Sequence, residues 1–152
     1  MTTATTLLSR AGRLYVRAEG SIDKLQSLFA LAVRLYLARV FIGSGLTKLH
    51  DWNITLALFE NEYHVPVLSP AAAALLGTAA ELGLPALLLA GFGTRLAALA
   101  LFVFNIVAAI SYPDLSDAGL KDHILWGALM LVLAVYGPGK LSVDHWLGRR
   151  NR

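Results

Sequence analysis

Four long apolar stretches, separated by short charged segments, are the feature that most constrains how this chain can fold. They cover residues 28–49, 68–91, 94–112 and 123–137. A helix needs about 20 apolar residues to cross a bilayer, and an isolated strand cannot cross it because its backbone groups would lack partners. The pattern therefore predicts an all-α integral membrane protein built as a four-helix bundle. The fourth stretch is short, and we expect Leu120 and Leu141 to complete it at its ends.

The composition points to lipid as the solvent and excludes several chemistries. Of the 152 residues, 57% are hydrophobic and 15% are charged, whereas soluble domains carry about 25% charged residues. A soluble domain this short could not bury so much apolar surface. The chain has no cysteine, which excludes disulfides, thiolate metal sites, iron–sulfur clusters and Cys-X-X-Cys redox chemistry. No basic patch with interleaved aromatic residues indicates nucleic-acid binding.

Three regions follow from these patterns. Residues 1–27 are predicted to form a cytoplasmic segment whose amphipathic helix, at 7–27, lies along the membrane surface with Arg10, Arg13 and Arg17 on its polar side. Residues 28–146 form the four-helix domain, and residues 147–152 form a basic cytoplasmic tail.

The charges at the joints predict the orientation in the membrane. The joints at 50–66 and 113–122 are acidic, whereas the turn at 91–95 and the C-terminal tail are basic. Positively charged segments stay on the cytoplasmic side. We therefore expect a multi-pass membrane protein with both termini in the cytoplasm and the two acidic joints outside.

Two charged residues fall near the middle of predicted spans. Arg39 in the first span and Glu81 in the second lie at similar depth, and a lone charge there costs several kcal/mol. We therefore predict a buried Arg39–Glu81 ion pair. The pair could fix how the two helices dock, or Glu81 could exchange protons beside a ligand. Arg34 and Lys48 lie on another face of the first span, and we expect them to extend to the inner and outer headgroups. If Lys48 instead points inward, it should meet the start of the fourth span.

Polar and aromatic residues are expected to gather near the outer surface, around a groove on the fourth span. Such a cluster could hold a quinone head, because His or Lys donates to a carbonyl and aromatic rings stack on the ring. The alternative is a set of interfacial polar residues in contact with water. Two histidines on separate helices could also bind a metal, but we predict no metal site from His50 and His123 alone. No residue is assigned a catalytic role. The candidate groove residues are Lys48, His50, Asn105, Tyr112, His123 and Trp126.

Several segments resemble the DoxX family. Residues 39–49 (RVFIGSGLTKL) resemble its first-span signature, and Glu81 followed by residues 89–95 (LAGFGTR) resembles its second-span glutamate and turn. His123 with Trp126 and Gly127, and then residues 137–144 (GPGKLSVD), resemble the start of its fourth span and its tail. The resemblance covers residues 28–146. It places five residues at family-like positions: Arg39, Lys48, Glu81, Arg95 and His123.

The resemblance implies a fold more firmly than an activity. The family is similar to the small membrane subunit of thiosulfate:quinone oxidoreductase, and other members are implicated in membrane redox complexes that answer oxidative stress. Residues 52–66 and 105–113 also look like a subgroup found in operons for metal-binding modified peptides.

Two functional hypotheses remain open. The chain has no flavin, haem or iron–sulfur fingerprint, so a quinone or a partner subunit would have to bring electrons. The first hypothesis is a quinone-linked accessory subunit of a membrane oxidoreductase or oxidative-stress complex. The alternative is a non-enzymatic scaffold that docks partner proteins in metal or stress homeostasis. Whether the chain is itself an enzyme stays open, and it is expected to associate with partner subunits or with further copies of itself.

Overall fold

The computed structural model describes the backbone of residues 2–150 and the side chains of residues 25–150. Within that range the chain is all-α and has no strand. Its helices are α1 (Thr2–His50), α2 (Trp52–Asn61), α3 (Pro70–Ala90), α4 (Thr94–Ser111), α5 (Asp117–Tyr136) and α6 (Val143–Arg150). Four segments are long and apolar enough to cross a membrane, namely Leu25–His50 of α1 and the whole of α3, α4 and α5. The predicted fold class is therefore confirmed.

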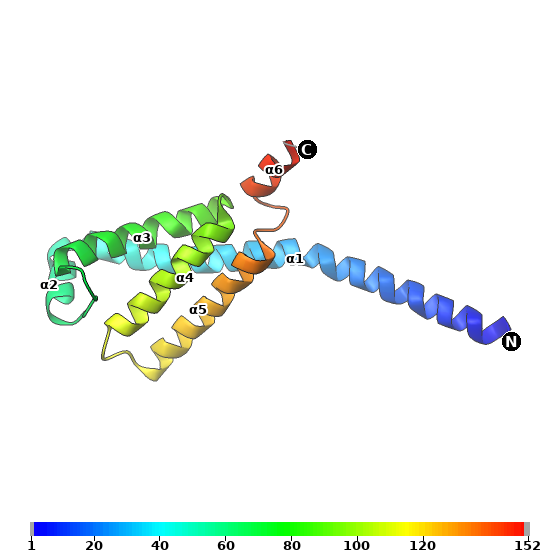
Figure 1. Cartoon of the computed structure of the whole chain (residues 1–152), viewed down its shortest axis with the longest axis horizontal. Coiled ribbons are helices and arrows are strands. Elements are labelled where there is room, and N and C mark those ends of the chain that lie inside the picture. The colour runs from blue at the N-terminus through cyan, green and yellow to red at the C-terminus, as the bar shows by residue number, and fades with distance from the viewer. Residues whose placement is uncertain (1, 151–152) are drawn as a thin grey trace.

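The four long helices pack as a bundle in which α1 lies against α3 and α4 lies against α5, with α3 also contacting α4. Figure 1 shows α2 at one end of this bundle, and α6 together with the N-terminal half of α1 at the other. The acidic joints thus share one end, and the basic turn and tail share the opposite end.

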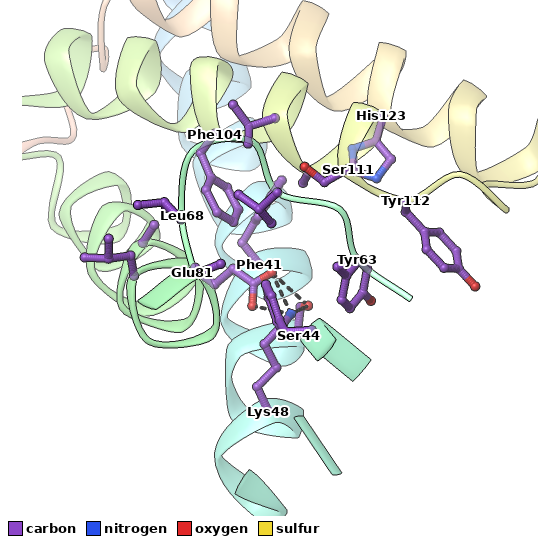
Figure 2. Close-up of a pocket in the computed structure, with 18 of the residues that line it drawn as sticks. Phe41, Ser44, Lys48, Tyr63, Leu68, Glu81, Phe104, Ser111, Tyr112 and His123 are labelled. Atoms are coloured by element: carbon purple, nitrogen blue, oxygen red, sulfur yellow. Dashed lines mark hydrogen bonds and ion pairs between the residues drawn. The ribbon is translucent and has the colours of Figure 1, made fainter. Parts of the chain in front are cut away.

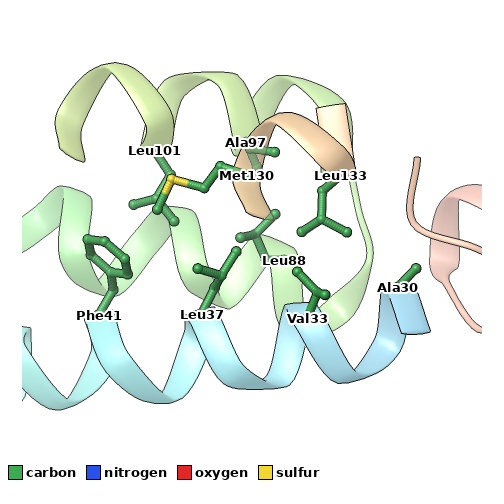
Figure 3. Close-up of a cluster of buried hydrophobic side chains, with 10 residues drawn as sticks. Ala30, Val33, Leu37, Phe41, Leu88, Ala97, Leu101, Met130 and Leu133 are labelled. Atoms are coloured by element: carbon green, nitrogen blue, oxygen red, sulfur yellow. The ribbon is translucent and has the colours of Figure 1, made fainter. Parts of the chain in front are cut away.

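The core is built from one stripe on each long helix (Figure 3). On α1 the buried residues Ala30, Val33, Leu37 and Phe41 recur every three or four positions, which is the spacing of one helix face. They meet a buried set from the other helices: Leu88, Ala97, Ala98, Leu101, Met130 and Leu133.

The outward faces of the long helices are apolar. Leu75 on α3, Leu96 and Ile110 on α4, and Ile124 on α5 each expose more than half of their surface. Apolar surface of this extent is typical of a membrane-contacting protein. The helix faces that point away from the core are therefore suited to contact with lipid.

The N-terminal region differs from the prediction in one respect. Helix α1 continues without a break from Thr2 into the first span, so no joint separates a surface helix from the span. The amphipathic stripe predicted over residues 7–27 lies mostly on side chains outside the described part of the chain.

The fourth span is longer at its start than predicted. Ser116 caps α5 by accepting a hydrogen bond from the backbone N–H of Gly119 at 3.1 Å, so the helix begins six residues before His123. It ends at Tyr136 and does not extend to Leu141, because Gly137 and Gly139 both adopt positive φ. Glycine takes this conformation without steric cost.

Two short helices were not predicted. Asp51 caps the start of helix α2 by accepting from the N–H of Ile54 at 3.0 Å, and the helix turns Thr55 and Phe59 inward. Helix α6 follows the glycine-rich segment at the other end. Helix α2 contributes Phe59 to the wall of a cavity in this half of the bundle.

Candidate functional site

A cavity of about 520 Å³ lies in the half of the bundle that contains α2 and the α4–α5 loop. Its walls are mainly apolar, with Val40 and Phe41 from α1, Phe59 from α2, and Phe104 and Val107 from α4. Polar side chains interrupt this lining at a few points: Ser44, Lys48, Tyr63, Glu81, Ser111, Tyr112, His123 and Trp126. Figure 2 shows many of them around the cavity. An apolar cavity of this size with a few polar groups is typical of small-molecule sites.

The α1–α3 wall carries an ion pair between Lys48 and Glu81. Lys48 Nζ lies 2.8 Å from Oε1 and 2.7 Å from Oε2 of Glu81, and 3.0 Å from Oγ of Ser44. Ser44 donates in turn to Oε1 of Glu81 at 3.2 Å. The two charged side chains are 17% and 8% exposed, so each neutralises the other away from water. We call this group the Lys48–Ser44–Glu81 cluster.

The predicted Arg39–Glu81 pair is wrong. Arg39 is exposed on the surface of α1, whereas Glu81 lies beside Gly45, where an added Cβ would be 3.2 Å from that of Glu81. Arg39 was predicted as the partner of Glu81 because the two residues lie at similar depth. Which residue pairs with Glu81 depends instead on which face of α1 points toward α3. Arg39 and Lys48 are nine residues apart, or about two and a half turns, and therefore lie on opposite sides of α1. Lys48 does point inward, but it meets α3 and not the start of the fourth span.

The α4–α5 wall is organised around His123. Asn105 is buried, donates from Nδ2 to the backbone carbonyl of His123 at 2.9 Å, and lies with its Oδ1 2.7 Å from His123 Nδ1. Trp126 packs edge-on against the His123 ring with centroids 5.0 Å apart, and its Nε1 donates to the hydroxyl of Tyr36 at 3.2 Å. Asn105 thus positions His123 rather than lining the cavity itself.

Ser111 and two tyrosines complete the cavity near the end of α4. The backbone carbonyl of Ser111 accepts from the N–H of His64 at 2.7 Å, which fastens the α2–α3 loop to α4. The Ser111 hydroxyl is buried and has no partner among the described residues. Tyr63 packs between Phe59 and Tyr112, with ring centroids 4.8 and 5.3 Å away. Burial raises the pKa of Tyr63, and the neighbouring Tyr112 and Glu81 raise it further.

Of the six predicted groove residues, four line the cavity: Lys48, Tyr112, His123 and Trp126. Asn105 supports His123 from behind. His50 is exposed at the end of α1 and is not part of the lining, so it does not join His123 at one site. Among the described side chains, no group of three or more His, Cys, Asp or Glu residues is arranged to hold a metal ion.

Sequence reasoning missed Phe59, Tyr63, Ser44 and Ser111. The aromatic pair lies in the segment that was predicted to be only a joint, although Asp51 before an apolar repeat is a recognisable helix start. No signal in the sequence singles out Ser111.

A second polar group lies at the opposite end of the bundle. Arg34 was expected to extend to the headgroups, but it is only 1% exposed and donates from Nη2 to the carbonyl of Leu141. It lies against Gly91, where any Cβ would overlap its Nη1. Asp144 accepts from the N–H groups of Gly93 and Thr94 at 2.7 and 2.9 Å. Arg34 and Asp144 together hold the C-terminal segment against the α3–α4 turn.

Arg95, another family-like position, is exposed in the first turn of α4. Its guanidinium lies close to Gly137, where an added Cβ would be 3.4 Å from Arg95 Nε. It belongs to the basic end of the bundle and not to the cavity.

Comparison with known protein families matches residues 29–113 to DoxX. This chain belongs to the DoxX family. The match covers α1 from Phe29, α2, α3 and α4, and therefore most of the cavity wall; α5 and the tail lie outside the matched range. The DoxX protein is also 34% identical, over 121 residues, to an uncharacterized protein of Haemophilus influenzae, a match that covers 75% of this chain and 80% of that one. No solved structure matches it.

Proposed function

We propose that this DoxX protein binds a quinone in the cavity and acts as a quinone-linked accessory subunit of a membrane oxidoreductase or oxidative-stress complex. The observation that carries the proposal is an apolar cavity of about 520 Å³ inside a membrane bundle, lined by aromatic rings and by a few polar groups. A quinone has a flat ring that packs on aromatic side chains and oxygens that need hydrogen-bond partners. The aromatic part of the lining would contact the ring, and the polar part would contact the oxygens.

The cavity wall supports binding of an uncharged ligand. Lys48 and Glu81 neutralise each other at 2.7 Å, so no net charge faces the cavity from α1 and α3. A neutral ligand in the cavity therefore does not lie against an unpaired charge. Such a charge would be costly in a low-dielectric interior.

The accessory role rests on what the side chains can supply. The chain contains no cysteine, so neither a dithiol nor a cysteine-ligated cluster of its own can pass electrons to the quinone. The electrons would come from a partner subunit that brings a redox cofactor.

The position of Arg39 supports the proposal that such a partner contacts this protein inside the membrane. It is exposed at about the middle of the Leu25–His50 span and makes no ion pair within the described part of the chain. A guanidinium facing hydrocarbon is costly. A transmembrane helix of a partner that carries an Asp or Glu at this depth would satisfy it.

We further infer that the protein resides in a bacterial inner membrane with both termini in the cytoplasm. Arg95 lies against Gly137, and the C-terminal segment that follows carries Lys140, Arg149 and Arg150. These basic residues share one end of the bundle, as the positive-inside rule requires of a cytoplasmic face. A reporter active only in the periplasm should be silent when fused after residue 152 and active when inserted in the 113–116 loop. The reverse pattern would overturn this orientation.

The quinone proposal is tested by identifying what the protein carries when it is purified in native lipid discs. Mass spectrometry of an organic extract should find quinone in excess of the amount in the surrounding lipid. The variant Ala108→Phe places a ring in the cavity and should remove that excess. Ala100→Phe is the matched control, because Ala100 lies exposed on the same helix and does not line the cavity.

The scaffold hypothesis gives a different result in the same experiment. A protein that only docks partners should carry no excess quinone, while a partner protein should co-purify in fixed stoichiometry from native membranes. Equal quinone content in the wild type and in Ala108→Phe would reject the quinone proposal.

A further inference from the structure

We propose that the cavity recognises its ligand through a hydroxyl group, which is held between Nε2 of His123 and Oγ of Ser111. This inference rests on the proposed function and specifies it, since it makes the reduced, hydroxyl-bearing quinol the preferred form. Oγ of Ser111 has no hydrogen-bond partner among the described residues, and His123 makes its side-chain contact through Nδ1.

The charged wall is already satisfied. The three N–H groups of Lys48 are matched by three acceptors, Ser44 Oγ at 3.0 Å and the two Glu81 oxygens at 2.8 and 2.7 Å. The Ser44 hydroxyl donates its own hydrogen bond to Glu81. A ligand oxygen arriving here would have to break one of these bonds, so the α1–α3 wall is a poor anchor.

Asn105 fixes which nitrogen of the neutral His123 ring carries the proton. The Nδ2 group of Asn105 donates to the backbone carbonyl of His123 at 2.9 Å, which settles the orientation of the amide. Oδ1 must then face His123 Nδ1 at 2.7 Å, and an amide oxygen can only accept. The proton of the neutral imidazole is therefore on Nδ1. Nε2 is left with a lone pair, and no described side chain hydrogen-bonds to it.

Ser111 supplies the complementary group. Its side chain is 2% exposed, lines the cavity, and has a hydroxyl without a partner. A buried hydroxyl left unpaired is unfavourable. Figure 2 shows Ser111 and His123 together on the α4–α5 side, apart from the Lys48–Ser44–Glu81 cluster.

These two atoms distinguish the redox forms of a quinone. A ligand hydroxyl can donate to Nε2 and accept from Ser111, and so satisfies both. A ketone oxygen has no proton to donate, so it can pair with Ser111 but leaves Nε2 unsatisfied. The site therefore favours the hydroxyl form.

The test is a calorimetric titration of the full-length protein in detergent with decylubiquinol, decylubiquinone and the dimethyl ether of decylubiquinol. We expect the quinol to bind about three- to tenfold more tightly than the other two, the loss expected for one hydrogen bond. Ser111→Ala and His123→Phe should each weaken quinol binding by a similar factor. His64→Phe is the matched control, because His64 is exposed and outside the cavity.

Ser111→Ala also separates a loss of ligand binding from a loss of folding. The hydroxyl has no partner to lose, so the variant should keep the wild-type melting temperature while binding quinol more weakly. Equal binding of quinol and quinone, unaffected by either variant, would overturn the inference and leave quinone binding standing. Preference for the quinone would overturn it too. Failure of all three compounds to bind would reject the inference and the proposed function together.

Discussion

Asp144 caps helix α4 by accepting a hydrogen bond from the N–H of Thr94 at 2.9 Å, although 50 residues separate the two in the chain. The residue before Thr94 is a glycine, which has no side chain to cap the helix itself. A carboxylate at a helix N-terminus also interacts favourably with the helix dipole. The C-terminal segment therefore completes a helix that the local sequence leaves uncapped.

Replacing Asp144 should destabilise the bundle without touching the cavity. Asp144→Ala removes both hydrogen bonds to the start of α4, and loss of such a cap costs about 1 kcal/mol. The melting temperature in detergent should fall, whereas quinone content should not change. Asp114→Ala, in an exposed loop, is the control and should melt like the wild type. Equal melting of the two variants would contradict the capping role.

We expect a large loss of stability when one residue of the Lys48–Glu81 pair is replaced, and a small loss when both are replaced. Glu81→Gln leaves the Lys48 ammonium without its partner in a poorly solvated position, which should cost about 3 kcal/mol. Lys48→Met combined with Glu81→Leu removes both charges and should recover most of that loss. Chemical unfolding of the wild type, the single variants Lys48→Met and Glu81→Leu, and the double variant gives the coupling energy. Glu60→Gln, on the exposed face of α2, is the control. Additive effects of the two single changes would show that the pair is not coupled.

Gly91 should tolerate no side chain. A Cβ there would overlap Nη1 of Arg34, come within 2.6 Å of Ser142 Cβ, and sit on a backbone with φ of 67°. Gly91→Ala is therefore expected to lower stability by more than 1 kcal/mol and to release the C-terminal segment to added trypsin. Gly43→Ala is the control, because nothing lies within 4 Å of its Cβ position and alanine favours a helix. Unchanged trypsin resistance in Gly91→Ala would argue against this contact.

Tyr63 should make the protein less stable in alkali. Burial raises the pKa of Tyr63 above its ordinary value of 10.0, so the folded protein holds the phenol proton more tightly than the unfolded chain. The corresponding stability is fully present below about pH 10 and is lost as the pH rises through the higher pKa of the folded state. Tyr63→Phe should therefore lose less stability than the wild type above that pH, whereas Tyr136→Phe, exposed on α5, should follow the wild type. Parallel curves for all three proteins would refute the burial argument.

Arg39 should matter for assembly and not for folding. It is exposed and makes no ion pair among the described residues, so Arg39→Leu should leave the melting temperature of the isolated protein unchanged. Affinity purification from native membranes should nevertheless recover less of any partner subunit. Recovery equal to that of the wild type would show that the partner, if bound, does not use this residue.

The arrangement of spans could be predicted from the sequence because bilayer thickness sets their length and apolar runs reveal them. The ends of α5 were harder, since Ser116 starts the helix inside a polar segment and the glycines at 137 and 139 end it. Helix α2 was missed because its 10 residues are too few to stand out as a span.

The contacts between helices were less predictable than the helices themselves. Depth in the membrane can be counted from the sequence, but the rotation of each helix depends on how all of them pack. Arg39 and Lys48 illustrate this, since both are cations of α1 and only the packing of α3 selects Lys48 for Glu81. Ser111 lies at the other extreme, because nothing in the local sequence distinguishes a serine facing a cavity from one facing a neighbouring helix.

Photo-crosslinking with an azido-quinone tests the central claim, that the cavity is where the ligand binds, most directly. Peptide mapping after irradiation of the protein in native lipid discs should place the adducts on cavity residues of α1 to α5. Ala108→Phe should abolish those adducts and Ala100→Phe should not. Adducts confined to the lipid-facing side chains, or unchanged in Ala108→Phe, would contradict the account.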